Sequence, residues 1–147
     1  MYKQISFDYI RGLVDGEGCF TFCWSGSGSS RQRIPTFSIG MIDKDYLLLE
    51  KVKTKLGLKN KVYQYSSRKR SDGYSRDGMA ILIVRDFGQI KNIIVPLFYK
   101  KLIGNKSKQF EDWILAMSKD PHVSKKFKLI PVLYNNGFYD NNFKNYD

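Results

Sequence analysis

Two carboxylate residues lie close together at the end of an apolar segment. Asp15 and Glu17 flank Gly16, and Gly18 follows. A carboxylate oxygen can hold a divalent metal ion, and a backbone carbonyl freed where a helix ends can be a second oxygen ligand. Such a metal supplies what phosphodiester hydrolysis needs: charge stabilisation, an activated water and help for the leaving oxygen. Glu17 with the Gly16 carbonyl is therefore a candidate metal site, although a lone Glu17 would equally fit a solvated turn.

The supply of histidine and cysteine excludes several other chemistries. His122 is the only histidine, so histidine-metal nucleases, two-histidine zinc fingers and metalloprotease motifs lack their partners. Cys19 and Cys23 have no companion pair, which excludes a four-cysteine zinc site and a disulfide framework. We interpret His122 as a surface residue and the cysteines as ordinary thiols.

Composition indicates one folded domain with a polyanionic partner. The chain has 147 residues, a net charge of +11, and 42% hydrophobic and 15% aromatic content, which is too apolar for a disordered polycation. Residues 61–128 hold 15 basic against 6 acidic residues, so the basic surface belongs to the middle of the chain. No leader pattern and no apolar run of about 18 residues appears, and we expect an intracellular protein with no membrane segment.

The segment that carries the two acids is expected to be a helix over residues 7–16. Ser6 can cap it, and glycines at 16 and 18 can end it. It carries few charges, and Gly12 and Gly16 at four-residue spacing leave room for close approach. Such a helix should be covered on two sides, by its own sheet and by a second helix.

The whole chain predicts an α+β domain that begins with the order αββαββα and adds one further helix. We expect strands at 19–24, 31–41, 61–67 and 79–84, and helices at 43–56, 87–97 and 106–119. The two hairpins should pair into one four-stranded antiparallel sheet with helices on one face. We place one domain at 1–134 and an Asn-rich tail without regular structure at 135–147.

The open face of this sheet is the expected ligand surface, because alternate strand residues point to the same side. A curved sheet of polar side chains framed by basic loop tips suits the major groove of DNA. The candidate contacts on strands are Thr21, Cys23, Ser25, Thr36, Ser38, Lys61, Tyr63 and Tyr65. Those at the two tips are Arg31, Gln32, Arg33, Arg68, Lys69, Arg70 and Arg76. The loop cations would contact phosphates or belong to a solvated turn, and the tyrosines would read bases or cover the sheet.

Residues 10–18, Ile-Arg-Gly-Leu-Val-Asp-Gly-Glu-Gly, resemble the nine-residue signature of the LAGLIDADG homing endonucleases. Four positions are identical, Gly16 replaces Ala and Glu17 replaces Asp. The segment Leu-Ile-Gly-Asn-Lys106 resembles the family's lysine-bearing segment ahead of its last helix. The resemblance covers roughly residues 5–120 and implies the family's saddle-shaped sheet.

The resemblance also implies roles for site residues. Glu17 and Gly16 would hold Mg²⁺, with Mn²⁺ as the alternative, and Lys106 would stabilise charge on the scissile phosphate or polarise water. Asp15 would be a structural group at the helix end. Single-motif chains of the family act as homodimers through the motif helix, which here gives an interface of Ile10, Gly12, Leu13, Asp15 and Gly16.

The implied function is an intron-encoded, metal-dependent endonuclease that cuts both strands of a long pseudo-palindromic duplex and leaves 3′ overhangs. Met41 stands where the family commonly has a polar, water-ordering residue. The alternative is a non-cleaving DNA-binding protein or an intron RNA maturase on the same scaffold. A structural RNA-binding protein, or a nuclease built on Glu50 with Lys53, explains the residues less well.

Enrichment in Lys, Asn, Tyr, Phe and Ile indicates an AT-rich genome, as in a mitochondrion, chloroplast, bacterium or phage.

Overall fold

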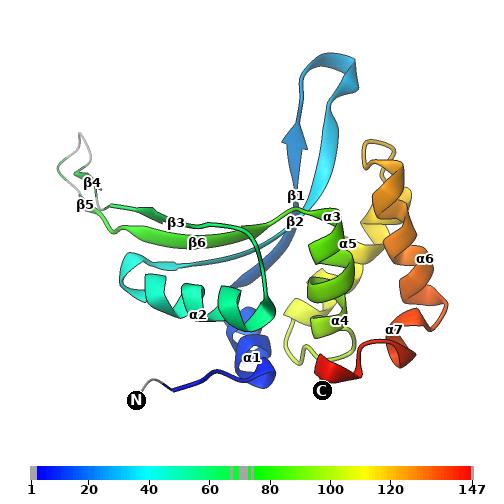
Figure 1. Ribbon diagram of the computed structural model, residues 1–147. Coiled ribbons are helices and arrows are strands. Elements are labelled where there is room, and N and C mark those ends of the chain that lie inside the picture. Colours follow the sequence, from blue (N-terminus) through cyan, green and yellow to red (C-terminus); the bar gives the residue numbers. More distant parts are fainter. Residues whose placement is uncertain (1–2, 67, 70–72, 74, 147) are drawn as a thin grey trace.

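One antiparallel sheet organises the chain (Figure 1). The computed structural model describes residues 3–66, 68–69, 73 and 75–146. The strands are β1 (Gly18–Ser25), β2 (Gln32–Ile42), β3 (Val62–Tyr65) and β6 (Met79–Val84), and they lie in the order β1-β2-β6-β3. The hairpins β1/β2 and β3/β6 therefore meet through β2 and β6, as the sequence predicts. Between β3 and β6 the short strands β4 (Arg68–Lys69) and β5 (Ser75–Arg76) pair separately.

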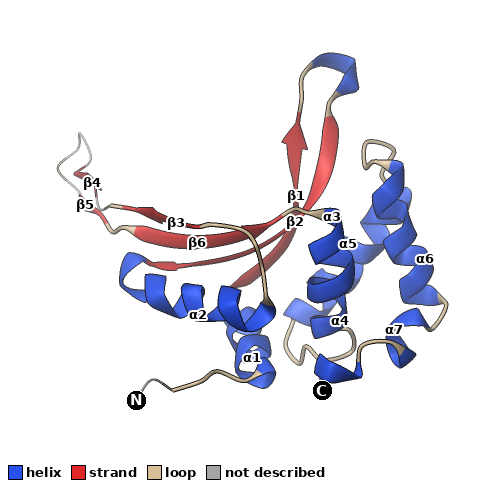
Figure 2. Cartoon of the chain, viewed as in Figure 1, coloured by secondary structure: helices blue, strands red, loops and turns tan. Residues whose placement is uncertain are grey.

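The helices cover one face of the sheet and leave the other open (Figure 2). Beneath it lie α1 (Phe7–Glu17) and α2 (Tyr46–Leu56), which follows a 3-10 turn, η2 (Asp43–Asp45). A second helical path consists of α3 (Phe87–Gln89), the π-helical η3 (Ile90–Ile94) and α4 (Val95–Phe98), and α5 (Lys106–Lys119) follows it. The predicted α+β class is confirmed. Among the described residues, no helix is long and apolar enough to cross a membrane.

The turn from α1 into β1 is the tightest connection in the chain. Ser6 caps α1 by accepting a hydrogen bond from the Tyr9 N–H at 3.0 Å. Gly18 ends the helix and starts the strand, and a Cβ there would stand 2.5 Å from Val14 Cγ1. Only glycine fits that close approach, so the helix passes into the strand with no intervening loop.

Helix α5 closes the outer edge of β1. The Trp113 Nε1–H donates to the Thr21 carbonyl at 2.7 Å, and the Phe20 N–H donates to Gln109 Oε1 at 3.2 Å. Phe20 also packs against Phe110 and Trp113, with ring centroids 5.0 and 5.1 Å apart. These bonds satisfy backbone groups that an edge strand leaves unpaired, and they fix α5 to the sheet.

The C-terminal segment differs from the expectation of a tail without regular structure. After η4 (Lys125–Lys128) and α6 (Leu129–Asn135), the chain forms α7 (Phe138–Asn141) and a last turn, η5 (Lys144–Tyr146). Tyr139 is only 5% exposed, and its hydroxyl donates to the Lys91 carbonyl at 2.9 Å. Burial raises the pKa of the Tyr139 hydroxyl above its ordinary value. Aromatic residues spaced among the asparagines supply apolar surface, so the expectation was wrong from Asn135 onward.

Arg11, inside the motif, is a buried structural cation with 5% exposure. Its Nε donates to the Leu97 carbonyl at 2.8 Å, its Nη1 to Asp8 Oδ1 at 2.9 Å, and its Nη2 to the Tyr146 carbonyl. One guanidinium thus ties α1 to the end of α4 and to the C-terminal turn.

A second polar cluster joins β2 to the loop after α5. Asp120 Oδ2 pairs with Arg33 Nη1 at 2.5 Å, and Asp120 Oδ1 accepts the His122 N–H at 2.8 Å. Lys128 Nζ donates to the Asp120 carbonyl at 2.8 Å. Burial by itself would raise the pKa of Asp120, but the His122 N–H and the Arg33 guanidinium outweigh it and hold this pKa below its ordinary value.

Replacing Arg11 by Met tests the first of these clusters. The substitution leaves the buried Leu97 carbonyl and the partly buried Tyr146 carbonyl without this donor, and we expect the free energy of unfolding to fall by about 2 kcal/mol. Urea unfolding measures the loss, and faster amide exchange in residues 138–146 should accompany it. The control is Arg85→Met, at an exposed arginine, with an expected change within about 0.5 kcal/mol. An equal loss in both variants would contradict the assignment.

Replacing Asp120 by Asn tests the second cluster. A carboxylate with a lowered folded pKa stabilises the fold above its unfolded pKa and loses that effect as the pH falls through the folded value. We expect Asp120→Asn to cost about 1–2 kcal/mol at pH 7, and the difference from wild type to shrink as the pH falls below about 4. Urea titrations at several pH values measure it. Asp112→Asn, which removes an exposed pair with Lys108, is the matched control.

Candidate nucleic-acid interface and active site

Strand register places one set of alternate residues on the open face. Thr21 lies opposite Thr36, Cys23 opposite Ile34 and Ser25 opposite Gln32. The residues between them, such as Phe20 and Phe37, are buried under the helices. The alternation that the sequence predicts is therefore present, and contact of these side chains with DNA stays a prediction.

Two tyrosines dominate the half of the open face that β3 and β6 form. Tyr63 is 45% and Tyr65 52% exposed, and Lys61 Nζ lies 5.9 Å from the Tyr63 ring centroid. A shallow pocket of about 280 Å³ runs along them and is lined by Asn60, Lys61, Tyr63, Tyr65, Ile83 and Arg85. Sequence reasoning missed Arg85, although it continues the alternation of Ile81 and Ile83 on this face.

Two predicted contacts are not on the open surface. Thr36 is only 3% exposed, and its hydroxyl donates to the Ile34 carbonyl at 2.9 Å. Arg33 has the parity of Phe37, points to the helix-covered side, and is paired with Asp120; its guanidinium lies 4.6 Å from the Phe22 ring centroid. Both residues support the hairpin rather than present polar atoms to a ligand, which corrects their assignment.

The remaining tip residues surround two hairpin ends. In the first, η1 (Gly28–Ser30) forms the tip, and the exposed Arg31 stacks 4.1 Å from the Trp24 ring centroid. Gln32 and Ser25 are exposed beside it, and Ser38 is half-buried further along β2. In the second, Arg68, Lys69 and Arg76 belong to the β4/β5 hairpin, and Arg70 lies outside the described residues. Both hairpins extend away from the helix-covered core (Figure 1).

The candidate metal ligands stand at the junction of α1 with the sheet. Glu17 is the last residue of α1, and both it and Gly16 are exposed. Among the described residues no three acidic, histidine or cysteine side chains gather into a metal-binding cluster. Both candidate donors are oxygen atoms, which suits a divalent cation. One chain, however, supplies only the Glu17 carboxylate to this site.

Lys106 begins α5, close in the fold to the end of α1. It is half-buried, and the loop before it is held by Asp15, whose Oδ2 accepts the Ile103 N–H and whose Oδ1 accepts the Gly104 N–H, both at 3.1 Å. Asp15 is therefore a structural group, as expected, but its carboxylate is occupied within its own chain. The structure brings the lysine-bearing segment to the acid-bearing helix.

The exposed face of α1 differs from the predicted interface. Gly12 and Gly16 are exposed, and a Cβ on either would meet no atom within 4 Å. Tyr9 on this helix is 48% exposed. Ile10, in contrast, is fully buried in the chain's own core, and Leu13 is half-buried against that core. Because Ile10 is buried in its own chain, it cannot contact a second helix, and its predicted place in the interface was wrong. The sequence alone did not show which apolar residues of the helix face the sheet.

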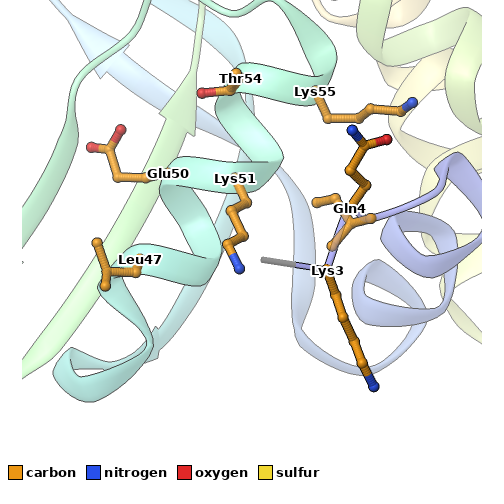
Figure 3. Close-up of a pocket in the computed structure, with 8 residues that line it drawn as sticks. Lys3, Gln4, Leu47, Glu50, Lys51, Thr54 and Lys55 are labelled. Carbon is orange, nitrogen blue, oxygen red and sulfur yellow. The ribbon is translucent and has the colours of Figure 1, made fainter. Parts of the chain in front are cut away.

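A separate pocket of about 820 Å³ lies between α2 and the N-terminal segment (Figure 3). Lys3 and Gln4 approach it from one side and Glu50, Lys51 and Lys55 from the other. Its lining includes neither Glu17 nor Lys106. Among the residues that the structure describes, no second acid lines this pocket beside Glu50, which gives no support to a nuclease site built on Glu50.

Comparison with solved structures finds the same fold in DNA-cutting enzymes. The LAGLIDADG homing endonuclease I-LtrWI, bound to target DNA, is 22% identical with a TM-score of 0.64, over 93% of this chain and 45% of that one. The meganuclease I-SmaMI, bound to uncleaveable DNA, is 26% identical with a TM-score of 0.62, over 93% of this chain and 45% of that one. I-SmaMI has also been solved with an uncleaved DNA target and calcium ions.

A third relative has the length of this chain. The homing endonuclease I-TnaI is 25% identical with a TM-score of 0.61, over 94% of this chain and 93% of that one. The present chain therefore spans about half of I-LtrWI and I-SmaMI and nearly all of I-TnaI. No curated protein matches the sequence. The model of the LAGLIDADG endonuclease family matches residues 10–117, most of the chain, and the chain belongs to that family.

Proposed function

We propose that this chain is a site-specific homing endonuclease that cuts both strands of a long pseudo-palindromic DNA duplex and leaves 3′ overhangs. The observation that carries the proposal is the contact of the end of α1, which bears Glu17, with the loop that leads to Lys106, made through Asp15 beside an open sheet with basic hairpin tips. The DNA-bound states of I-LtrWI and I-SmaMI support a duplex as the ligand of this fold.

The duplex would lie on the open face between the two hairpin tips. Exposed side chains with donor or acceptor atoms, such as Gln32, Ser25 and Thr21, are suited to base edges. The tyrosine pair with Lys61 and Arg85 offers aromatic surface and two cations along the same face. The net charge of +11 supplies phosphate attraction, so affinity should fall steeply as salt rises.

The chemistry at the phosphate would come from few groups. Glu17 and the Gly16 carbonyl would hold Mg²⁺, or Mn²⁺ in its place, as oxygen ligands. When bound, the metal supplies charge stabilisation and lowers the pKa of bound water. The Lys106 ammonium would stabilise charge on the scissile phosphate or orient the attacking water.

One chain would act as half of the active particle. Cutting two strands needs a second carboxylate, and no metal-binding cluster exists among the described residues of one chain. The exposed Gly12 and Gly16 leave a flat helix face on which α1 of a second copy can pack. A homodimer would thus place one Glu17 at each scissile phosphate and explain a pseudo-palindromic target. I-TnaI is a homing endonuclease of this fold with about the length of this chain.

Met41 supports a second candidate function. It lies on the helix-covered face of β2 and packs against the core, so it supplies no polar atom for ordering water. A non-cleaving DNA-binding protein, or a maturase that binds intron RNA, would keep the basic open face without needing that group. The Glu17 experiment separates this candidate from the endonuclease.

Glu17→Gln should abolish cleavage and leave DNA binding intact. The amide keeps the shape of the side chain but loses the charge that holds a divalent ion, and we expect the cleavage rate to fall at least about 100-fold. A library of duplex targets with Mg²⁺ measures cutting, and recovery of bound duplexes measures affinity. Glu50→Gln, which changes an acid on α2, is the control and should cut like wild type. If wild type binds and does not cut, the binding-protein candidate replaces the endonuclease.

Gly12→Gln should break the dimer without harming the monomer. A Cβ at Gly12 meets nothing within 4 Å in the chain, and glutamine is a better helix former than glycine, so the fold should be as stable or slightly more stable. The longer side chain would block the close approach of a second α1. Sedimentation at micromolar concentration should show a monomer for this variant and a dimer for wild type.

The matched control is Ser118→Gln, an equally exposed helical position on α5. It should stay dimeric. A wild-type chain that is monomeric both free and on DNA would contradict the homodimer.

A further inference from the structure

Asp15 does more than end a helix, because both of its carboxylate oxygens are used by one loop. Oδ2 accepts the Ile103 N–H and Oδ1 accepts the Gly104 N–H, each at 3.1 Å. Two parallel bonds to consecutive backbone groups fix the position and the orientation of the loop. The next residue but one is Lys106, so the constraint acts within two residues of the lysine.

The path from this loop to the lysine is itself hydrogen-bonded. The Gly104 carbonyl accepts the Ser107 N–H at 3.0 Å, which brackets Lys106 within one turn. A Cβ at Gly104 would lie 3.5 Å from Asp15 Oδ1, so the backbone approaches the carboxylate closely. The segment that Asp15 holds therefore leads directly into the first turn of α5.

A second bond ties the same two segments beyond the site. The Phe20 N–H, at the start of β1, donates to Gln109 Oε1 at 3.2 Å. Glu17 lies between Asp15 and Phe20 in the chain, and Lys106 lies between Gly104 and Gln109. Each candidate catalytic residue is thus flanked on both sides by residues bonded to the other's segment.

We propose that Asp15 and Gln109 are positioning residues that set Lys106 in register with Glu17. This inference rests on the proposed endonuclease function, because it states that the three hydrogen bonds matter for DNA cleavage. Contacts by the buried Val14, Phe110 and Trp113 already hold α1, β1 and α5 in the core. The three bonds lie in the more exposed part of this junction, where they add little to global stability but limit where the lysine can stand. Reaction rates are sensitive to displacements of about 1 Å, so placement is the property that they should affect most.

The first experiment uses Asp15→Asn in the full chain, on a duplex that wild type cuts. The amide offers one acceptor oxygen where two N–H groups need two, so one bond is lost. We expect the single-turnover cleavage rate at saturating enzyme to fall about 10- to 100-fold. The DNA dissociation constant should stay within about 2-fold and the melting temperature within about 4 °C. Lys106→Ala measures the rate without the lysine.

The double variant Asp15→Asn with Lys106→Ala gives the decisive comparison. If Asp15 acts through Lys106, adding Asp15→Asn to Lys106→Ala should cost no further rate. An equal additional loss in that background would overturn the proposal, because Asp15 would then act by another route. A loss of DNA affinity or melting temperature that accounts for the rate would overturn it as well.

Gln109 offers a rescue test on the other side of the site. Gln109→Leu removes the acceptor for the Phe20 N–H and should slow cleavage, whereas Gln109→Glu keeps an acceptor oxygen and should restore most of the rate. Equal rates in the two variants would count against Gln109 as a positioning residue.

Amide exchange makes the test independent of cutting. Asp15→Asn should speed exchange of the Ile103 and Gly104 amides while amides within β2 stay protected. Unchanged exchange at both positions would overturn the proposal even where cleavage is impaired. A wild type that binds DNA without cutting it would refute the proposed endonuclease function, and the hydrogen bonds of Asp15 would then have no role in cleavage. The exchange measurement would still show whether Asp15 holds the loop.

Discussion

The close approach of Gly18 to Val14 is the constraint on which the rest of the structure depends. The missing side chain of Gly18 lets α1 pass into β1 without a loop, so the last residue of the helix directly precedes an edge strand of the sheet. A longer connection would let Glu17 move relative to the strands. The same turn fixes where β1 begins, and therefore its register with β2 and the identity of the residues on the open face.

The polar groups divide between the two sides of the sheet according to their partners. On the helix side, the guanidinium groups of Arg11 and Arg33 contact carbonyls, carboxylates and aromatic rings of their own chain. On the open side, Lys61 and Arg85 remain exposed along a shallow pocket, and at the hairpin tip Arg31 is exposed over the Trp24 ring. A buried cation without partners is costly, so the paired arginines stiffen the scaffold and the exposed cations are left for a polyanion.

Much of the fold could be predicted because its signals are local. Alternation along the strands separated Phe20 and Phe37 from Thr21 and Ser38, and Ser6 and Gly18 marked the limits of α1. The errors concern partners far away in the chain. Ile10 was placed at a helix interface because an apolar helix does not reveal which side meets its own sheet. Arg33 was counted as a contact although it alternates with the open-face residues, and its partner Asp120 is 87 residues away. The C-terminal segment is held by contacts with the remote Lys91 and Arg11, which its Asn-rich composition does not reveal.

The spacing of the two acids explains how one short motif can serve two purposes. Residues two apart on an α-helix point about 200° apart, so Asp15 and Glu17 cannot serve the same ligand while both remain helical. Asp15 turns toward the loop at residues 103–104 and is satisfied there, while Glu17 at the helix end stays exposed. Asp15 thus holds the loop, and Glu17 stays available for the proposed metal site. The second carboxylate that the proposed reaction requires would then come from outside this helix, and no cluster among the described residues provides it. The helix periodicity that separates the two acids is therefore itself an argument for a second copy at the exposed face of α1.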